Sequence, residues 1–111
     1  MKMIERLGAQ GDVMFVRVSE IPADAVRTPT PGDRVVVAHS ETGHDHEVHA
    51  AGLGYYVSKD PLVCYLRLEG VGDATHLRSW DTHETLRLTP GTWMVRGQRE
   101  YTPEGYRRVE D

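Results

Sequence analysis

The chain has 111 residues, 39% of them hydrophobic, and its 17 acidic and 13 basic residues give a formal net charge of −4. This length suits one domain, and the negative charge argues against a nucleic-acid partner. The apolar runs are too short for a membrane span, no signal-peptide pattern opens the chain, and the single cysteine excludes an internal disulfide. We therefore expect one soluble domain over 1–111 that binds neither nucleic acid nor a membrane.

The first half of the chain predicts two strands and a hairpin. Residues 12–18 are apolar and rich in β-branched side chains, which is typical of a buried strand. An extended connector, 28–33, ends in a Pro-Gly turn signal and leads into a valine-rich strand that runs to His39. A hairpin turn is expected from residues 40–43, and with a four-residue turn at 41–44 His39 would lie directly across from His46 on the returning strand.

The second half predicts further short strands. A hairpin is expected around 59–61. In its second strand Cys64 and three leucines alternate with Val63, Tyr65, Arg67 and Glu69. This period of two predicts one buried face and makes Cys64 a core residue rather than a reactive thiol. Weaker strand patterns follow at 74–80 and 84–88, and a Pro-Gly turn signal at 90–91 precedes the segment 92–96. Together the segments predict an all-β fold, a small sandwich or barrel of seven to eight short antiparallel strands.

The C-terminal segment 96–111 is predicted to be a docking tail. Thr102 and Pro103 favour the start of a short helical turn. The segment also mixes arginines and acidic residues with tyrosines, so we expect it to dock onto a second copy in a homo-oligomer or onto another protein. The predicted interface residues are aromatic or arginine side chains: Trp93, Arg99, Tyr101, Tyr106, Arg107 and Arg108.

Histidines are the most unusual feature of the sequence, and four of the six lie close together: His39, His44, His46 and His49. His44 and His46 are two apart, so on a strand their side chains share a face. Neutral imidazoles in this arrangement are typical ligands of Zn²⁺ or another transition metal, and their protonation would weaken binding as the pH falls through about 6.5. The alternative interpretation is a polar hairpin tip whose surface histidines bind nothing.

The two histidines that follow Gly43 resemble the His-x-His pattern of cupins, in which two histidines, a glutamate and a later histidine bind a metal on a β-barrel. In this chain the glutamate expected shortly after the pair is missing, and no histidine follows the turn at Pro90-Gly91. The resemblance implies the barrel architecture, with a cupin-like metal-dependent enzyme as an alternative function.

A second resemblance covers most of the chain and concerns a family of short uncharacterised proteins found in bacteria and in tailed-phage genomes. Its motifs are Gly11-Asp12-Val13, Ile21-Pro22, Thr42-Gly43-His44-Asp45-His46, Thr82-His83-Glu84, Leu88-Thr89-Pro90-Gly91 and Gln98-Arg99-Glu100-Tyr101-Thr102-Pro103-Glu104. The resemblance implies a phage or prophage setting and no particular activity.

These observations favour a structural or interaction module over an enzyme. The spacing of the residues assembles no convergent acid, base and nucleophile, so we expect no enzymatic activity. The most concrete hypothesis is a bacteriophage capsid decoration (cement) protein that binds a capsid subunit and stabilises the virion. The expected location is then the bacterial cytoplasm on synthesis and the virion afterwards. The alternative is a metal-binding accessory protein built on the histidine cluster.

Overall fold

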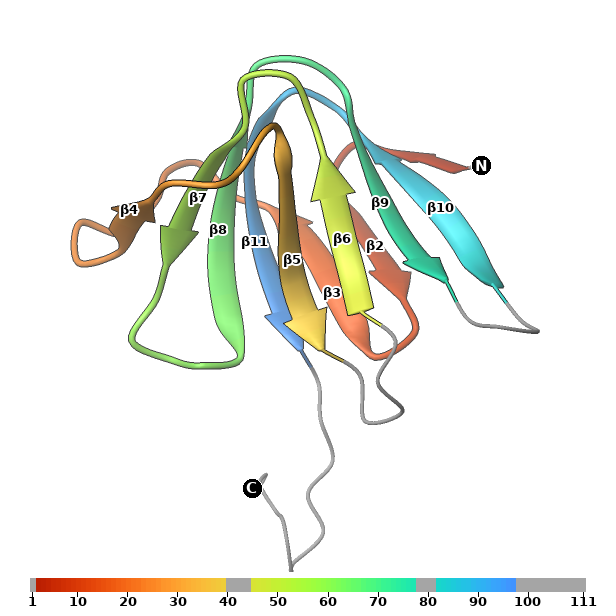
Figure 1. Ribbon diagram of the computed structural model, residues 1–111, viewed down its shortest axis with the longest axis horizontal. Helices are drawn as coiled ribbons and strands as arrows, with labels where there is room; N and C mark the ends of the chain where they lie inside the picture. Colours follow the sequence, from red (N-terminus) through yellow and green to blue (C-terminus); the bar gives the residue numbers. More distant parts are fainter. Residues whose placement is uncertain (1, 40–44, 78–81, 98–111) are drawn as a thin grey trace, which may run out of the picture.

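The computed structural model describes residues 2–39, 45–77 and 82–97, and the strands in these ranges form two sheets (Figure 1). Sheet A has the strand order β1, β10, β9, β6, β5, with the bounds Lys2–Ile4, Thr82–Leu88, Gly72–Leu77, Asp45–His49 and Arg34–His39. Sheet B has the order β2, β3, β11, β8, β7, β4, with the bounds Leu7–Gln10, Val13–Arg17, Gly91–Gly97, Val63–Leu68, Gly54–Val57 and Val26–Thr28. In Figure 1 sheet A lies in front of the central strands of sheet B, so each sheet has one inner and one outer face.

Local sequence explains the tight connections between sequential strands. The β2–β3 turn uses Gly11 at a φ of 61°, a left-handed conformation that glycine adopts without steric cost. In the β7–β8 hairpin the Asp60 carboxylate accepts a hydrogen bond from the backbone N–H of Leu62 at 2.9 Å. The Ser58 hydroxyl accepts one from the N–H of Asp60 at 3.0 Å. These side chains satisfy backbone donors that the ladder leaves open at the turn.

The core lies between the inner faces of the two sheets. Phe15 and Leu66 from sheet B and Val48 and Leu88 from sheet A have no exposed surface. Strand β8 follows the predicted alternation, because Cys64, Leu66 and Leu68 point inward whereas Tyr65 and Arg67 point outward. Each large apolar side chain removed from water in this way stabilises the fold by about 1.5–3 kcal/mol.

The all-β prediction is confirmed, and its finer details need correction. Eleven strands occupy the described ranges in place of seven to eight, because β1, β2 and β4 are strands of three or four residues with little apolar pattern. The sheets are separate layers rather than a closed barrel, and β1 pairs in parallel with β10. The described ranges contain no helix, and none that could cross a membrane. The helical turn predicted from Thr102 lies outside the described residues.

The predicted register of the β5–β6 hairpin is also wrong by one residue. His39 pairs with Asp45, and Ala38 takes the position across from His46. Before an irregularity between Val36 and Ala38 the pairing differs from the prediction by two residues, because Val36 lies across from Glu47, and the irregularity shifts the register one residue toward the predicted one. An extra residue in one strand moves every later pair, and the hydrophobic pattern of consecutive valines gives no sign of it.

Candidate functional site

Two histidines lie stacked inside the sandwich. His46 on β6 and His76 on β9 are cross-strand partners, and both side chains are almost fully buried. Their ring centroids are 3.8 Å apart with an interplanar angle of 17°. The next strand, β10, places the backbone of His83 across from His76. A transverse row of three histidine positions therefore crosses sheet A.

A glutamine from sheet B holds this pair across the core. The Gln10 amide donates to the carbonyl of Ala74 at 2.8 Å, which leaves its Oε1 to accept from Nδ1 of His46 at 3.0 Å. The proton of a neutral His46 ring therefore sits on Nδ1, and Nε2 carries the lone pair. That Nε2 is buried, has no hydrogen-bond partner among the described residues, and lies 3.7 Å from Oδ1 of Asp12. A lone pair beside a carboxylate is a place for a proton or a cation.

The structure separates His46 from His49, two of the four histidines predicted as metal ligands. His46 points into the core, whereas His49 is exposed on the outer face of sheet A, with its Nε2 3.5 Å from the Glu47 carboxylate. His44 and the side chain of His39 lie outside the described residues. Within the described ranges no three histidine, cysteine or acidic side chains converge on a metal position. Stacked rings such as those of His46 and His76 present their nitrogens side by side rather than toward one ion.

Cys64 is a core residue, as the alternation of β8 predicts. Its side chain is buried among apolar neighbours, and this burial raises the pKa of the Cys64 thiol to about 12. Nucleophilic chemistry requires the thiolate, so a thiol with this pKa is inert near neutral pH.

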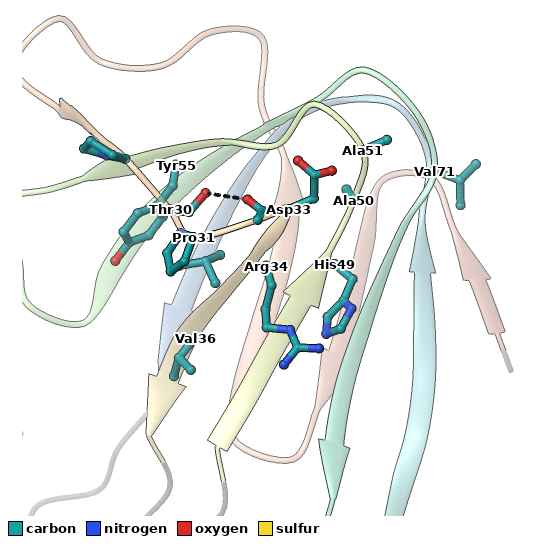
Figure 2. Close-up of a pocket in the computed structure, with 13 residues that line it drawn as sticks. Thr30, Pro31, Asp33, Arg34, Val36, His49, Ala50, Ala51, Tyr55 and Val71 are labelled. Carbon is teal, nitrogen blue, oxygen red and sulfur yellow. Dashed lines mark hydrogen bonds between the residues drawn. The ribbon is translucent and has the colours of Figure 1, made fainter.

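An open groove of about 930 Å³ lies where the 29–33 connector meets the start of β5 (Figure 2). Arg34 and His49 border it on the outer face of sheet A, and Tyr55 lies on the other side of the connector. Arg34 already has an acidic neighbour outside the groove, because its Nε lies 3.9 Å from the Glu47 carboxylate. The lining offers no convergent acid, base and nucleophile.

Trp93, predicted to be an interface residue, is fully buried in the core. Its indole N–H donates to the carbonyl of Thr89 at 2.9 Å, and the Arg17 guanidinium lies 5.0 Å from the ring centre. Arg17 is itself held by the carbonyls of Glu5 and Pro90. The indole thus has internal partners for both its polar and its aromatic surface. The other predicted interface residues, Arg99, Tyr101, Tyr106, Arg107 and Arg108, lie outside the described residues.

The outer face of sheet B is a surface that the sequence patterns did not predict. One residue of each strand faces outward in a single register row across the sheet: Leu7, Val16, Met94, Tyr65, Tyr56 and Arg27. We call these six residues the sheet B row. Leu7 is 57% exposed and the four central members are half-buried. No strand in the described ranges covers this face, because sheet A occupies the other one.

The outer face of sheet A is polar and carries paired charges. Arg87 contacts the Asp73 carboxylate through two nitrogens, at 2.9 and 3.4 Å. Asp73 hydrogen-bonds and attracts the guanidinium, and both effects raise the pKa of Arg87. Glu47 lies between Arg34 and His49 on the same face. This is the usual surface of an antiparallel sheet that faces water.

The fold and its surfaces define a two-layer β-sandwich with one apolar outer face. A family model described as "Domain of unknown function (DUF8820)" matches residues 9–98, and the chain belongs to this family. The membership agrees with the uncharacterised family that the sequence motifs indicate. Comparisons with curated proteins and with solved structures found no significant match.

Proposed function

We propose that this protein is a non-enzymatic interaction module that binds a partner protein through the outer face of sheet B. In its most concrete form it is a bacteriophage capsid decoration protein. The observation that carries the proposal is the sheet B row, which aligns Leu7, Val16, Met94, Tyr65 and Tyr56 on an outward surface. An antiparallel sheet that faces only water carries polar residues at such positions. A contiguous exposed apolar patch is typical of a protein interaction site.

The composition of the row favours a protein partner. Tyrosine, methionine and arginine are enriched in protein–protein interfaces, whereas lysine and the acidic residues are depleted. The strands of sheet B follow this pattern, since they contain no lysine, aspartate or glutamate. The resemblance to proteins of tailed-phage genomes supports the capsid as the partner.

The patch is small, which suits a repetitive partner. Six strands at a spacing of about 4.8 Å and a length of about 20 Å give a flat footprint of roughly 500 Å². A stable interface buries about 800 Å² on each partner, so a single contact through this face is expected to be weak. A capsid presents the same site many times, and oligomerisation of the protein through 96–111 would add avidity.

The test begins with the genes that flank this one. Neighbouring major-capsid and portal genes support the proposal, whereas a metabolic operon contradicts it. Shells assembled from the major capsid protein of the same genome are then mixed with the full chain and sedimented. We expect saturable co-sedimentation and a higher disruption temperature of the decorated shells. Folded protein that stays in the supernatant at every concentration would reject the capsid proposal.

One contact favours a second candidate, a metal-binding accessory protein. The lone pair on Nε2 of buried His46 faces the Asp12 carboxylate at 3.7 Å. Histidine nitrogen and carboxylate oxygen are the ligand types that Zn²⁺ accepts. Calorimetric titration with Zn²⁺ should give heat with the wild type and none with a His44→Ala/His46→Ala variant. Equal heats from the two proteins would reject this assignment.

A further inference from the structure

The charges on the outer face of sheet B point to the chemistry of its partner. The strands of sheet B contain four arginines: Arg17, Arg27, Arg67 and Arg96. Arg17 is bound internally beside Trp93. The other three are exposed and alternate onto the outer face, and none of them forms an ion pair with the described residues. Within the described ranges, the face therefore carries three positive charges that no carboxylate pairs with.

Two of these arginines are held in place at one end of the sheet B row. The guanidinium carbons of Arg27 and Arg67 lie 5.8 and 5.7 Å from the centre of the Tyr56 ring. Arg67 also donates to the Tyr56 hydroxyl at 3.5 Å. Contacts of this kind orient a planar guanidinium while its remaining N–H donors stay in water. A fork of donors beside an apolar strip suits a bidentate carboxylate.

We infer that the outer face of sheet B binds a protein surface that carries carboxylates beside an apolar centre, with Arg27, Arg67 and Arg96 as the charged contacts. This inference rests on the proposed function, because it names the partner chemistry of the same face. Charge complementarity carries it: the strands of the sheet supply positive charge only, so an acidic partner gains attraction and a basic partner is repelled.

A second copy of the chain fits this face less well. Two sheet B faces packed together would bring six outward arginines into one interface, with no carboxylate from the strands of either copy of the sheet to pair with them. The carboxylates of Glu47 and Asp73 on the outer face of sheet A already bind Arg34, His49 and Arg87 within the same chain. Those ion pairs would have to break before sheet A could serve as the acidic partner.

Nucleic acid also fits less well. A single strand needs aromatic rings that are free to stack on bases. The ring of Tyr56 is instead in contact with two guanidinium groups, and the other aromatic member of the row, Tyr65, lies beside Met94 at the centre. The net charge of −4 adds repulsion over the rest of the molecule.

The first experiment uses a short peptide that alternates glutamate with leucine and tyrosine, titrated into the full-length chain. We expect binding that weakens with salt and falls at least tenfold in an Arg27→Glu/Arg67→Glu variant. Arg96→Glu, on the neighbouring strand β11, should give a smaller loss in the same direction. The matched control is Arg34→Glu, an exposed arginine on sheet A, which should leave the affinity unchanged. Thermal unfolding of each variant verifies its fold.

Three results would overturn the inference. One is equal binding of the peptide by the wild type and the folded Arg27→Glu/Arg67→Glu variant, or no binding by either. The second is equal or tighter binding of oligothymidine or of a peptide with lysine in place of glutamate. The third is a wild-type homodimer that dissociates into monomers in the Arg27→Glu/Arg67→Glu variant.

Hydroxyl-radical footprinting then locates the surface. Met94 and Tyr65 should be oxidised in the free chain and protected by the peptide, whereas Met3, 52% exposed on β1, should react equally in both. Protection of Met94 in the free monomer would mean that the chain covers this face itself, which contradicts the inference.

Binding to capsid shells distinguishes the inference from the proposed function. If the shells bind the charge-reversed variant as tightly as the wild type, the inference is rejected and the proposed function stands. If the wild type binds the peptide and does not bind the shells, the capsid proposal is rejected and the inference stands.

Discussion

The outer faces of the two sheets differ in how their arginines are compensated. On sheet A, Arg34 and Arg87 lie beside the carboxylates of Glu47 and Asp73. On sheet B, the exposed Arg27 and Arg67 lie against the Tyr56 ring and form no ion pair with the part of the chain that the structure describes, and Arg67 also donates to the Tyr56 hydroxyl. Both sheets present arginines to water, but only on sheet B do the described residues leave those arginines without an acidic partner.

The outer face of sheet B also carries more apolar side chains in one row than the outer face of sheet A. Alternation along the strands of sheet A places acidic residues, threonines and arginines outward, as a solvated sheet requires. The sheet B row aligns five apolar or aromatic side chains from five strands. A contiguous apolar patch that carries charges of only one sign is typical of an interaction site, so the comparison supports the proposal that sheet B carries the binding face.

The largest expected effect contrasts the two sides of strand β8. Cys64 points inward and Tyr65 outward, and burial raises the pKa of the thiol from 9.0 to about 12. At pH 8 this lowers the thiolate fraction about 1000-fold, so iodoacetamide should alkylate Cys64 about 1000-fold more slowly in the folded chain than in urea. Tyr65 should be oxidised readily by hydroxyl radicals in the same folded sample. A folded-state alkylation rate within tenfold of the unfolded rate would contradict the contrast.

The same shift sets a dependence of stability on pH. Because the folded chain holds the thiol proton more tightly than the unfolded chain does, this contribution is complete below pH 9 and is lost as the pH rises from about 9 to about 12. Urea unfolding should show a steeper alkaline loss of stability for the wild type than for Cys64→Ala. Identical slopes would show that the thiol does not contribute.

Placing a charge at the centre of the sheet B row should have the next largest effect. Met94 lies between Val16 and Tyr65, so Met94→Glu breaks the apolar strip and should lower the affinity for capsid shells at least 100-fold. The side chain faces outward, so the thermal unfolding temperature should change little. The matched control is Val71→Glu, because Val71 is 46% exposed at the groove of Figure 2. Equal losses in the two variants would remove the distinction between the surfaces.

Gln10 and its neighbour Ala9 test the inner and outer sides of strand β2. Gln10→Ala removes two hydrogen bonds and leaves Nδ1 of His46 and the Ala74 carbonyl buried without that partner. Each unsatisfied buried group costs about 1–3 kcal/mol, so we expect a loss of about 2 kcal/mol in urea unfolding. Ala9→Gln, on the exposed side, should change stability by less than about 0.5 kcal/mol. A loss below that figure for Gln10→Ala would mean that the polar link between the sheets contributes little.

Local patterns were sufficient for the parts of the fold that depend on one strand or one turn. Strand β8 was predictable because Cys64, Leu66 and Leu68 repeat every second residue, and its hairpin because Asp60 and Pro61 mark a turn. Strands β1 and β2 were not, since segments of three or four residues with an exposed Met3 or Leu7 carry too little periodicity. Such strands form only because longer neighbours offer them an edge.

The candidate sites depend on pairing between distant segments, which periodicity does not contain. His46 was a candidate from its spacing to His44, but its stacking partner His76 lies on a strand that pairs with β6 only in the folded sheet. The sheet B row likewise depends on a strand order that places β11 between β3 and β8. Met94 and Val16 therefore look like ordinary strand residues until the sheet is assembled.

The smallest effects are expected on sheet A, where the ion pairs are exposed. Arg87 approaches Asp73 through two nitrogens at 38% exposure of both side chains, whereas Arg34 is 61% exposed and 3.9 Å from Glu47. Geometry and burial decide the value of such pairs, so Arg87→Ala should lower the urea midpoint slightly and Arg34→Ala should leave it unchanged. Both losses should be far smaller than that of Gln10→Ala, and molar salt should reduce the Arg87 effect further.

A double-mutant cycle over Arg87 and Asp73 isolates the pair, with Arg34 and Glu47 as its control. If the pair of Arg34 and Glu47 proved stronger than the pair of Arg87 and Asp73, exposure and distance would not determine the strength of the ion pairs on the outer face of sheet A. If both pairs proved absent in solution, the carboxylates of sheet A would be free to bind a second copy through sheet B.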